Sequence, residues 1–170
     1  MADITAAWQR EKPGMPTDSI AILTPITRLA KLLNDDRARL LRRAGIDSAT
    51  LDLLSVLRRS GPPYVLTTRD ISARSLVTAG AISQRLSRAE KDGLIRRAPS
   101  PTGRRAVAVT LTDKGHSLVD DVVEDLLTHE SHLIGDLTDP EREALKTLLD
   151  KLATSLQRHL SEIGEDSPPA

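Results

Sequence analysis

Apolar residues recur at spacings of three and four along most of this chain, a pattern that is typical of amphipathic helices. The pattern predicts a short helix over residues 2–12, a long helix over 17–44 and a third helix that begins at Asp47 or Ser48. Pro25 lies inside the long pattern, where we expect it to kink the helix or to mark its true start.

Two further helices are predicted towards the end of the chain. The first runs from Thr112, a suitable capping residue, to about residue 136. The second restarts at Thr138, with Pro140 in its first turn and Glu141 at the position that completes a capping box. Its leucines continue at helical spacing to Leu160, so both ends of the chain are predicted to be helical.

The pattern changes over residues 66–111. Thr67 or Thr68 can cap one short helix, and Thr78 can cap a second helix whose apolar positions form one stripe. Gly93 then supplies a left-handed stop. The segment therefore begins with two helices separated by a turn.

A hairpin is predicted after the second of these helices. Its strands are Leu94–Ile95 and Val107–Leu111, and Pro99, Pro101 and Gly103 break the chain between them. Two helices followed by a hairpin with a basic tip form a winged helix-turn-helix, which places a helix in the major groove of DNA. The predicted fold class is mainly α with a small β-hairpin wing (α+β).

The elements divide the chain into four expected parts. Residues 1–45 are the N-terminal and long helices, for dimerisation and as the lid of a ligand pocket. Residues 46–112 are the winged helix-turn-helix DNA-binding domain, residues 113–163 are C-terminal dimerisation helices, and residues 164–170 are a disordered tail.

The formal net charge is zero, but the charge is unevenly distributed. Residues 58–111 carry eleven basic and three acidic side chains, whereas residues 112–170 carry five basic and fourteen acidic ones. A basic segment that coincides with the winged-helix pattern is the electrostatic footprint of phosphate binding. We therefore expect double-stranded DNA as a partner, with the acidic part facing away from it.

Composition narrows the possible chemistry. Cysteine is absent, which excludes disulfides, thiolate metal sites and thiol redox sensing within this chain. Trp8 and Tyr64 are the only aromatic residues. There is no apolar run of membrane-spanning length and no signal-peptide pattern, so we expect a cytoplasmic protein with no membrane contact.

Short polar and basic side chains on the outer face of the second helix and at the wing can reach base edges and phosphates. The candidate DNA-binding residues are Thr67, Thr78, Ala81, Ser83, Gln84, Arg85, Arg88, Arg104 and Arg105. The alternative for this segment is a solvated helix face with an ordinary hairpin.

Long apolar stripes at both ends exceed what a small winged-helix core can cover. We expect them to pair with a second copy of the chain. A two-fold dimer places two recognition helices on successive turns of one DNA face, so the operator should be a pseudo-palindrome. An intramolecular helical subdomain is the alternative.

Several short blocks of the sequence resemble the MarR family of dimeric bacterial transcriptional regulators, over nearly the entire chain. The blocks are Leu53–Leu57, Leu66–Thr68, Ser83–Leu86, Glu90–Arg97, Gly103–Arg105 and Val109–Gly115. The last two, taken together, are specific. The resemblance implies that Arg105 enters the minor groove, although Gly103 stands where the family's wing usually has an Asp.

A narrower resemblance is to the urate-responsive branch of this family, which has an extra N-terminal helix bearing a Trp. The segment Ala6–Pro13 looks like that helix. The branch's ligand residues correspond to Trp8, Asp52, Arg85 and Arg97. The resemblance therefore implies a repressor that a small anion such as urate releases from DNA.

The chemistry of these residues fits a planar, oxidised purine anion. Arg97 can form a forked, charge-assisted contact, Trp8 can pack or donate its indole N–H, and Asp52 can accept a ring N–H. Asp52 lies on a leucine-rich helix, so we expect it to be partly buried and, in the free protein, paired with Arg85 or Arg97. An entering anion would compete for that arginine, pull on the recognition helix and shift the dimer away from the half-site spacing.

Other interpretations of these ligand residues remain open. Trp8 can be a docking anchor, Asp52 part of a structural ion pair, and Arg97 a phosphate contact. Another small organic acid or a phenolic compound can also be the ligand.

Three other functions compete with this one. A zinc-responsive regulator would use the histidines of the C-terminal helices with nearby carboxylates, namely His116, His129, His132, His159, Asp125 and Glu130. A structural DNA-compacting protein would bind all sequences alike. An enzyme is not expected, because no nucleophile elbow, phosphate loop or facing carboxylate pair is found, and no cofactor is implied.

Overall fold

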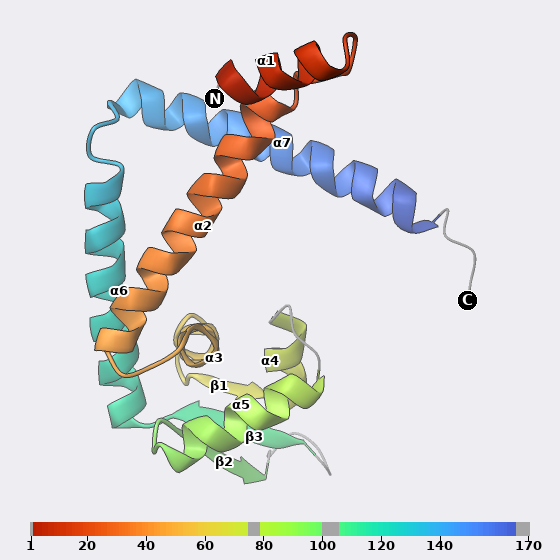
Figure 1. Cartoon of the computed structure of the whole chain (residues 1–170). Helices are drawn as coiled ribbons and strands as arrows, with labels where there is room; N and C mark the ends of the chain where they lie inside the picture. Colours follow the sequence, from red (N-terminus) through yellow and green to blue (C-terminus); the bar gives the residue numbers. More distant parts are fainter. Residues whose placement is uncertain (1, 75–78, 100–105, 166–170) are drawn as a thin grey trace. The chain divides into compact units, whose positions relative to one another are not determined.

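The structure is a computed structural model of the 170-residue chain, and it describes residues 2–74, 79–99 and 106–165 (Figure 1). The helices are α1 (Ala2–Glu11), α2 (Ile20–Arg43), α3 (Ser48–Arg58), α4 (Thr68–Arg74), α5 (Ala79–Lys91), α6 (Asp113–Leu133) and α7 (Asp139–Glu165). The strands are β1 (Val65–Thr67), β2 (Ile95–Pro99) and β3 (Val107–Leu111). The chain divides into two compact units, Met1–Leu126 and Leu127–Ala170.

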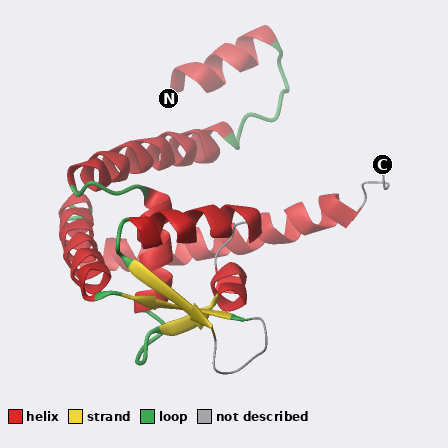
Figure 2. Ribbon diagram, turned by 90° about the horizontal axis from the view of Figure 1, so that it is seen from below, coloured by secondary structure: helices red, strands yellow, loops and turns green. Residues whose placement is uncertain are grey.

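The three strands form one antiparallel sheet in the order β1-β3-β2, and Figure 2 shows the strands in yellow. The β2–β3 pairing confirms the predicted hairpin, and Arg97 lies opposite Val109 in its register. Strand β1 was not predicted. The prediction that Pro99 breaks the chain was wrong, because Pro99 ends β2 opposite Val107. An edge strand tolerates a proline, since one of its sides has no partner strand.

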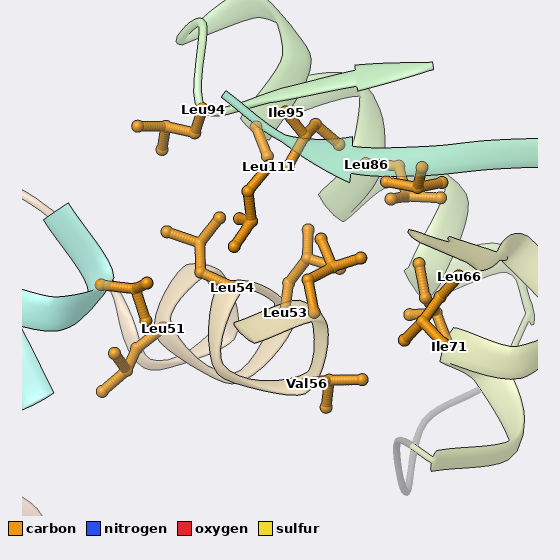
Figure 3. Packing of buried hydrophobic residues seen from close by; sticks show 14 of the residues in the cluster. Leu51, Leu53, Leu54, Val56, Leu66, Ile71, Leu86, Leu94, Ile95 and Leu111 are labelled. Carbon is orange, nitrogen blue, oxygen red and sulfur yellow. The ribbon is translucent and has the colours of Figure 1, made fainter. Parts of the chain in front are cut away.

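Leucines of α3 form the centre of the core in the first unit. Leu53, Leu54 and Leu57 are almost completely buried, and Figure 3 shows Leu53 and Leu54 among side chains from α4, α5 and the sheet. Val119 extends the same core onto α6. The helices around α3 are therefore fixed by a continuous apolar cluster.

The predicted caps of α3, α4 and α6 are present. The Asp47 carboxylate accepts a hydrogen bond from the N–H of Thr50 at 2.8 Å. At the start of α4, the Thr67 hydroxyl accepts from the N–H of Asp70 at 3.2 Å, and the Asp70 carboxylate accepts from Thr67 in return. The Thr112 hydroxyl accepts from the N–H of Gly115 at 3.0 Å. Each helix therefore begins where its capping side chain stands.

The sequence predicted that the long N-terminal helix begins at residue 17 or, alternatively, at Pro25, and the structure agrees with neither start. Helix α2 begins at Ile20, and Pro25 lies inside it and does not mark its beginning. The flanking Thr17 is buried and receives a hydrogen bond from Gln9 of α1 at 2.9 Å. This bond links the end of the first helix to the start of the second.

The start of α6 is fastened to the turn between α5 and β2. The N–H of Thr112 donates to the carbonyl of Leu94 at 3.0 Å, and the hydroxyl of Thr112 donates to the carbonyl of Gly93 at 2.7 Å. Gly115 faces the same turn, where a Cβ would stand 2.0 Å from the Leu94 oxygen. A residue without a side chain is required there for α6 to approach the turn so closely.

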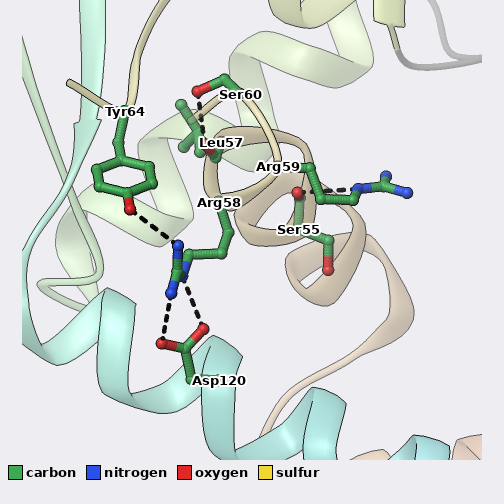
Figure 4. A network of polar contacts seen from close by, with 7 residues as sticks. All are labelled: Ser55, Leu57, Arg58, Arg59, Ser60, Tyr64 and Asp120. Carbon is green, nitrogen blue, oxygen red and sulfur yellow. Dashed lines mark hydrogen bonds and ion pairs between the residues drawn. The ribbon is translucent and has the colours of Figure 1, made fainter. Parts of the chain in front are cut away.

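A polar network joins the end of α3 to α6 (Figure 4). The guanidinium of Arg58 donates two bonds to the Asp120 carboxylate, at 2.8 and 3.1 Å, and one to the Tyr64 hydroxyl at 3.1 Å. The Tyr64 ring meets the His116 ring edge-on at a centroid distance of 4.8 Å. Hydrogen bonding from Arg58 lowers the pKa of Asp120, so the pair is charged at neutral pH.

Helices α2 and α7 expose many large apolar side chains. On α2 these are Ile22, Leu23, Leu29, Leu32 and Leu33, and on α7 they are Leu145, Leu148, Leu149, Leu156 and Leu160. The predicted contact of Glu141 with the capping residue is formed, since the Glu141 carboxylate accepts from the backbone N–H of Thr138 at 2.8 Å. Helix α7 runs to Glu165, two residues into the predicted disordered tail, and residues 166–170 lie outside the described part. None of the described helices is both long and apolar enough to span a membrane.

Candidate nucleic-acid interface and ligand residues

The rotation of α5 is fixed by three buried side chains, Ile82, Leu86 and Ala89. Because successive residues turn by about 100° around a helix, the opposite face carries Gln84, Ser87 and Lys91. All three are exposed, as are the predicted DNA-binding residues Ser83 and Arg88, whereas Ala81 and Arg85 are half-buried. The outer face of α5 is therefore polar, with cations towards its C-terminal end.

Ser87 and Lys91 were not among the predicted DNA-binding residues. The signal that could have identified them was present in the sequence, because they follow Gln84 at spacings of three and four along the same helix face. The prediction favoured residues near the start of the helix and stopped at Arg88.

One flank of α5 is held to the start of α3. The guanidinium of Arg88 donates to the Asp47 carboxylate at 2.7 Å, and its Nε lies 4.0 Å from the carboxylate of Asp92. Hydrogen bonding from Thr50 holds the pKa of Asp47 below its usual range, and the charges of Arg88 and Arg85 act in the same direction. The α5 arginines Arg85 and Arg88 therefore lie close to the carboxylate of Asp47.

The other flank of α5 is held to the sheet. Arg97 on β2 donates to the Glu90 carboxylate through Nε at 2.8 Å and again through Nη2. Hydrogen bonding from Arg97 lowers the pKa of Glu90, and the carboxylate in turn raises the pKa of Arg97. The pair is therefore fully charged at neutral pH.

The structure assigns other environments to some of the predicted DNA-binding residues. The Thr67 hydroxyl is engaged in the cap of α4 with Asp70. Thr78, Arg104 and Arg105 lie outside the described residues. The described part of the predicted interface is thus the outer face of α5.

The four predicted ligand residues are not joined to one another. Within the described ranges, no hydrogen bond, ion pair or ring contact links any two of Trp8, Asp52, Arg85 and Arg97. Trp8 is 48% exposed on α1. Their proximity in a binding site therefore stays a prediction.

The expectation that Asp52 is partly buried and paired with an arginine was wrong. Asp52 is exposed, and the described part of the chain gives it no ion pair. The helical register explains this, because the apolar side chains of α3 that enter the core are its neighbours Leu51, Leu53 and Leu54. The arginines that it was expected to meet are instead close to Asp47 and Glu90.

An open recess of about 650 Å³ lies beside Arg97. It lies where the end of α5, the start of β2 and the start of α6 meet, and Glu90, Arg96 and Lys114 contribute to its lining. Small-molecule sites have volumes of this order. The recess leaves Arg97 accessible to solvent.

The histidines considered for zinc do not form a described site. Among the described residues, no group of three or more metal-ligating side chains is found. His116 meets the Tyr64 ring edge-on, and Nδ1 of His159 lies 2.8 Å from the carbonyl of Ser155. The structure provides no described cluster for the zinc alternative.

A helix with a polar, cationic outer face, packed on a three-stranded sheet, is the arrangement of a winged-helix fold. Residues 44–106 match the model of the MarR family. The HTH-type transcriptional regulator PecS of Dickeya dadantii strain 3937 is 26% identical over 160 residues, which are 94% of this chain and 94% of PecS. The chain is therefore similar to winged-helix transcriptional regulators over most of its length, and its residues 44–106 are similar to the MarR family model.

Solved structures show the same similarity. A mutant of MarR from E. coli, crystallised with operator DNA, is 26% identical, with a TM-score of 0.61 over 79% of this chain and 98% of that chain. A MarR family regulator from Streptomyces coelicolor, also in complex with DNA, has the same fold at 23% identity, with a TM-score of 0.72 over 84% and 90% of the two chains. The similar proteins are transcriptional regulators and not enzymes.

Proposed function

We propose that this protein is a homodimeric repressor that binds a pseudo-palindromic operator and leaves it when a small planar anion of the urate type binds. The observation that carries the proposal is the outer face of α5, where Gln84, Ser87 and Lys91 are exposed opposite the buried stripe. Its surroundings, residues 58–111, have a large excess of basic side chains. Polar side chains for base edges and cations for phosphates are what major-groove binding requires.

The dimer is supported by the exposed leucines of α2 and α7. Leu148 and Leu160 are 64% and 66% exposed, although they continue a regular apolar stripe. A stripe of this kind is stable in water when a partner covers it. A second copy of the chain supplies a matching stripe, and two-fold symmetry then sets the spacing of two α5 helices on DNA.

The ligand proposal rests on the charge and accessibility of four residues. Arg97 lines the open recess, Arg85 is half-buried on the same helix as Glu90, and Trp8 and Asp52 are exposed. An anion would take a forked contact from Arg97, and an exposed carboxylate such as Asp52 would accept a ring N–H. Because Arg97 is bound to Glu90 on α5, a ligand at Arg97 would act directly on the recognition helix.

Fluorescence anisotropy with labelled duplexes tests both the proposed DNA binding and the proposed response to a ligand. Wild-type protein should bind a selected pseudo-palindromic duplex as a dimer, and urate at millimolar concentration should weaken that binding. The Arg97→Ala variant should still bind the duplex but lose the response to urate. Unchanged wild-type affinity in urate would remove the ligand assignment, while failure to bind duplex DNA at low salt would remove the whole proposal.

A further inference from the structure

Two ion pairs hold α5 near its C-terminal end, and they lie on different flanks. Arg88 pairs with Asp47 of the α3 cap, and Glu90 pairs with Arg97 of β2. Residues two apart on a helix point about 200° away from each other. The two pairs therefore leave the helix in nearly opposite directions, on either side of the exposed face that carries Ser87 and Lys91.

Each pair ends on an element that is itself well fixed. Asp47 uses one carboxylate oxygen for the N–H of Thr50, so that its other oxygen is held in place for Arg88. Arg97 lies in β2 opposite Val109, which is completely buried in the central strand. The helix is therefore connected to α3 on one flank and to the sheet on the other.

The polarity of the two pairs is opposite. On the α3 flank the helix contributes the cation, and on the sheet flank it contributes the carboxylate. A rotation of α5 about its axis would lengthen at least one pair, because the partners lie on different sides. Charge-assisted hydrogen bonds weaken quickly with distance and angle, so the two pairs together oppose rotation in either direction.

We propose that Asp47 and Glu90 are positioning residues for DNA recognition, because they fix the angle at which α5 presents Gln84 and Ser87 to base edges. This inference rests on the proposed DNA-binding function. It assigns a role to two carboxylates that lie beside a surface for a polyanion. Charge alone would disfavour them there, since each repels DNA phosphates.

Positioning and simple charge repulsion have different consequences for a variant. Loss of either carboxylate removes one negative charge near the DNA surface, which strengthens binding to every sequence by the same factor. Loss of positioning acts only on contacts to base edges, because these need a defined helix orientation. The ratio of the dissociation constants for scrambled and operator DNA therefore separates the two effects.

The experiment compares wild type with Asp47→Asn and Glu90→Gln, on an operator duplex selected in vitro with the wild type and on a scrambled duplex of equal length. Asparagine still caps a helix, so Asp47→Asn removes the ion pair and retains the cap. The matched control is Asp120→Asn, which removes a carboxylate from an ion pair between α3 and α6 that does not involve α5.

We expect each of the two variants to lower the scrambled-to-operator ratio by about 1.5-fold to fivefold, the range that exposed ion pairs allow. The control should change both dissociation constants by one factor and leave the ratio as in wild type. Unchanged ratios in both Asp47→Asn and Glu90→Gln would overturn the proposal.

Amide hydrogen exchange of the DNA-free proteins gives a second, independent result. Residues 85–92 should exchange faster in both variants than in wild type, while the rest of the first unit keeps its protection. If in vitro selection with the wild type yields no operator duplex, the proposed sequence-specific DNA binding is wrong. Amide hydrogen exchange alone then decides whether Asp47 and Glu90 fix the orientation of α5. Unchanged exchange over residues 85–92 would then overturn the positioning role.

Discussion

Leucines at helical spacing have different surroundings in two regions of this molecule. In α3, Leu54 and Leu57 are completely buried, whereas in α7 Leu148 is 64% exposed and Leu160 is 66% exposed. The spacing is the same, so the difference lies in what the rest of the chain provides. The winged-helix core buries its own leucines, whereas the leucines of α7 stay exposed in a single chain, which is what the proposed dimer would explain.

The largest effect is expected from a substitution in α7 that disrupts the proposed dimer. Leu148→Asp should dissociate the dimer, because burial of a leucine contributes about 1.5–3 kcal/mol and a two-fold interface contains the residue twice. The dimer dissociation constant should rise by more than about 100-fold, measured by analytical ultracentrifugation.

Leu148→Met is the control for this change, since it keeps an apolar side chain of similar volume. The helical signal in circular dichroism should be retained in both variants. A Leu148→Asp variant that stays dimeric would show that this leucine does not contribute to the interface.

The next effect concerns the core itself. Leu54→Ala should lower the free energy of unfolding by about 2–5 kcal/mol, since Leu54 is completely buried in the apolar cluster. Urea unfolding followed by circular dichroism measures this loss. The same substitution at the exposed Leu160 should leave the unfolding of an isolated protomer almost unchanged, and equal losses at the two positions would contradict the comparison.

A smaller effect is expected where α6 meets the turn between α5 and β2. Gly115→Ala places a Cβ 2.0 Å from the backbone oxygen of Leu94, so that the backbone must shift. We expect a loss of stability of about 1–3 kcal/mol in urea unfolding. Gly80→Ala is a suitable control for the glycine change, because no atom lies within 4 Å of its added Cβ.

The smallest effect belongs to the cap of α7. Hydrogen bonding from Thr138 lowers the pKa of Glu141 below its ordinary value of 4.5. Its contribution to helix stability is therefore complete above pH 4.5 and is lost as the pH falls through the lowered value. Circular dichroism between pH 7 and pH 3 should show a loss of helix in wild type, and a smaller change over the same range in Thr138→Ala.

Much of the fold could be predicted from local signals in the sequence. The caps at Asp47, Thr67, Thr112 and Thr138 depend on residues within three positions of each other, and such contacts are encoded by spacing. Gly93 has a φ of 71°, as its place after a helix indicated. Strand β1 was missed because three residues carry too little periodicity to be distinguished from a loop.

The candidate site was harder to predict because its contacts are distant in sequence. Arg88 and Asp47 are 41 residues apart, so no spacing rule links them. The prediction paired Asp52 with an arginine because a carboxylate on a leucine-rich helix needs a partner when buried. The register of α3 instead exposes Asp52 to solvent, and this depends on which neighbouring helices cover the face.

Binding of duplex DNA by the outer face of α5 is the central claim, and the Gln84→Ala/Lys91→Ala double variant tests it most directly. Both side chains are exposed, so folding and dimerisation should be unchanged. We predict that the wild type binds a selected operator at low salt and that the double variant binds it at least about tenfold more weakly, from the loss of one base contact and one phosphate contact. Equal affinity of wild type and double variant for that operator would contradict the claim that this face of α5 enters the major groove.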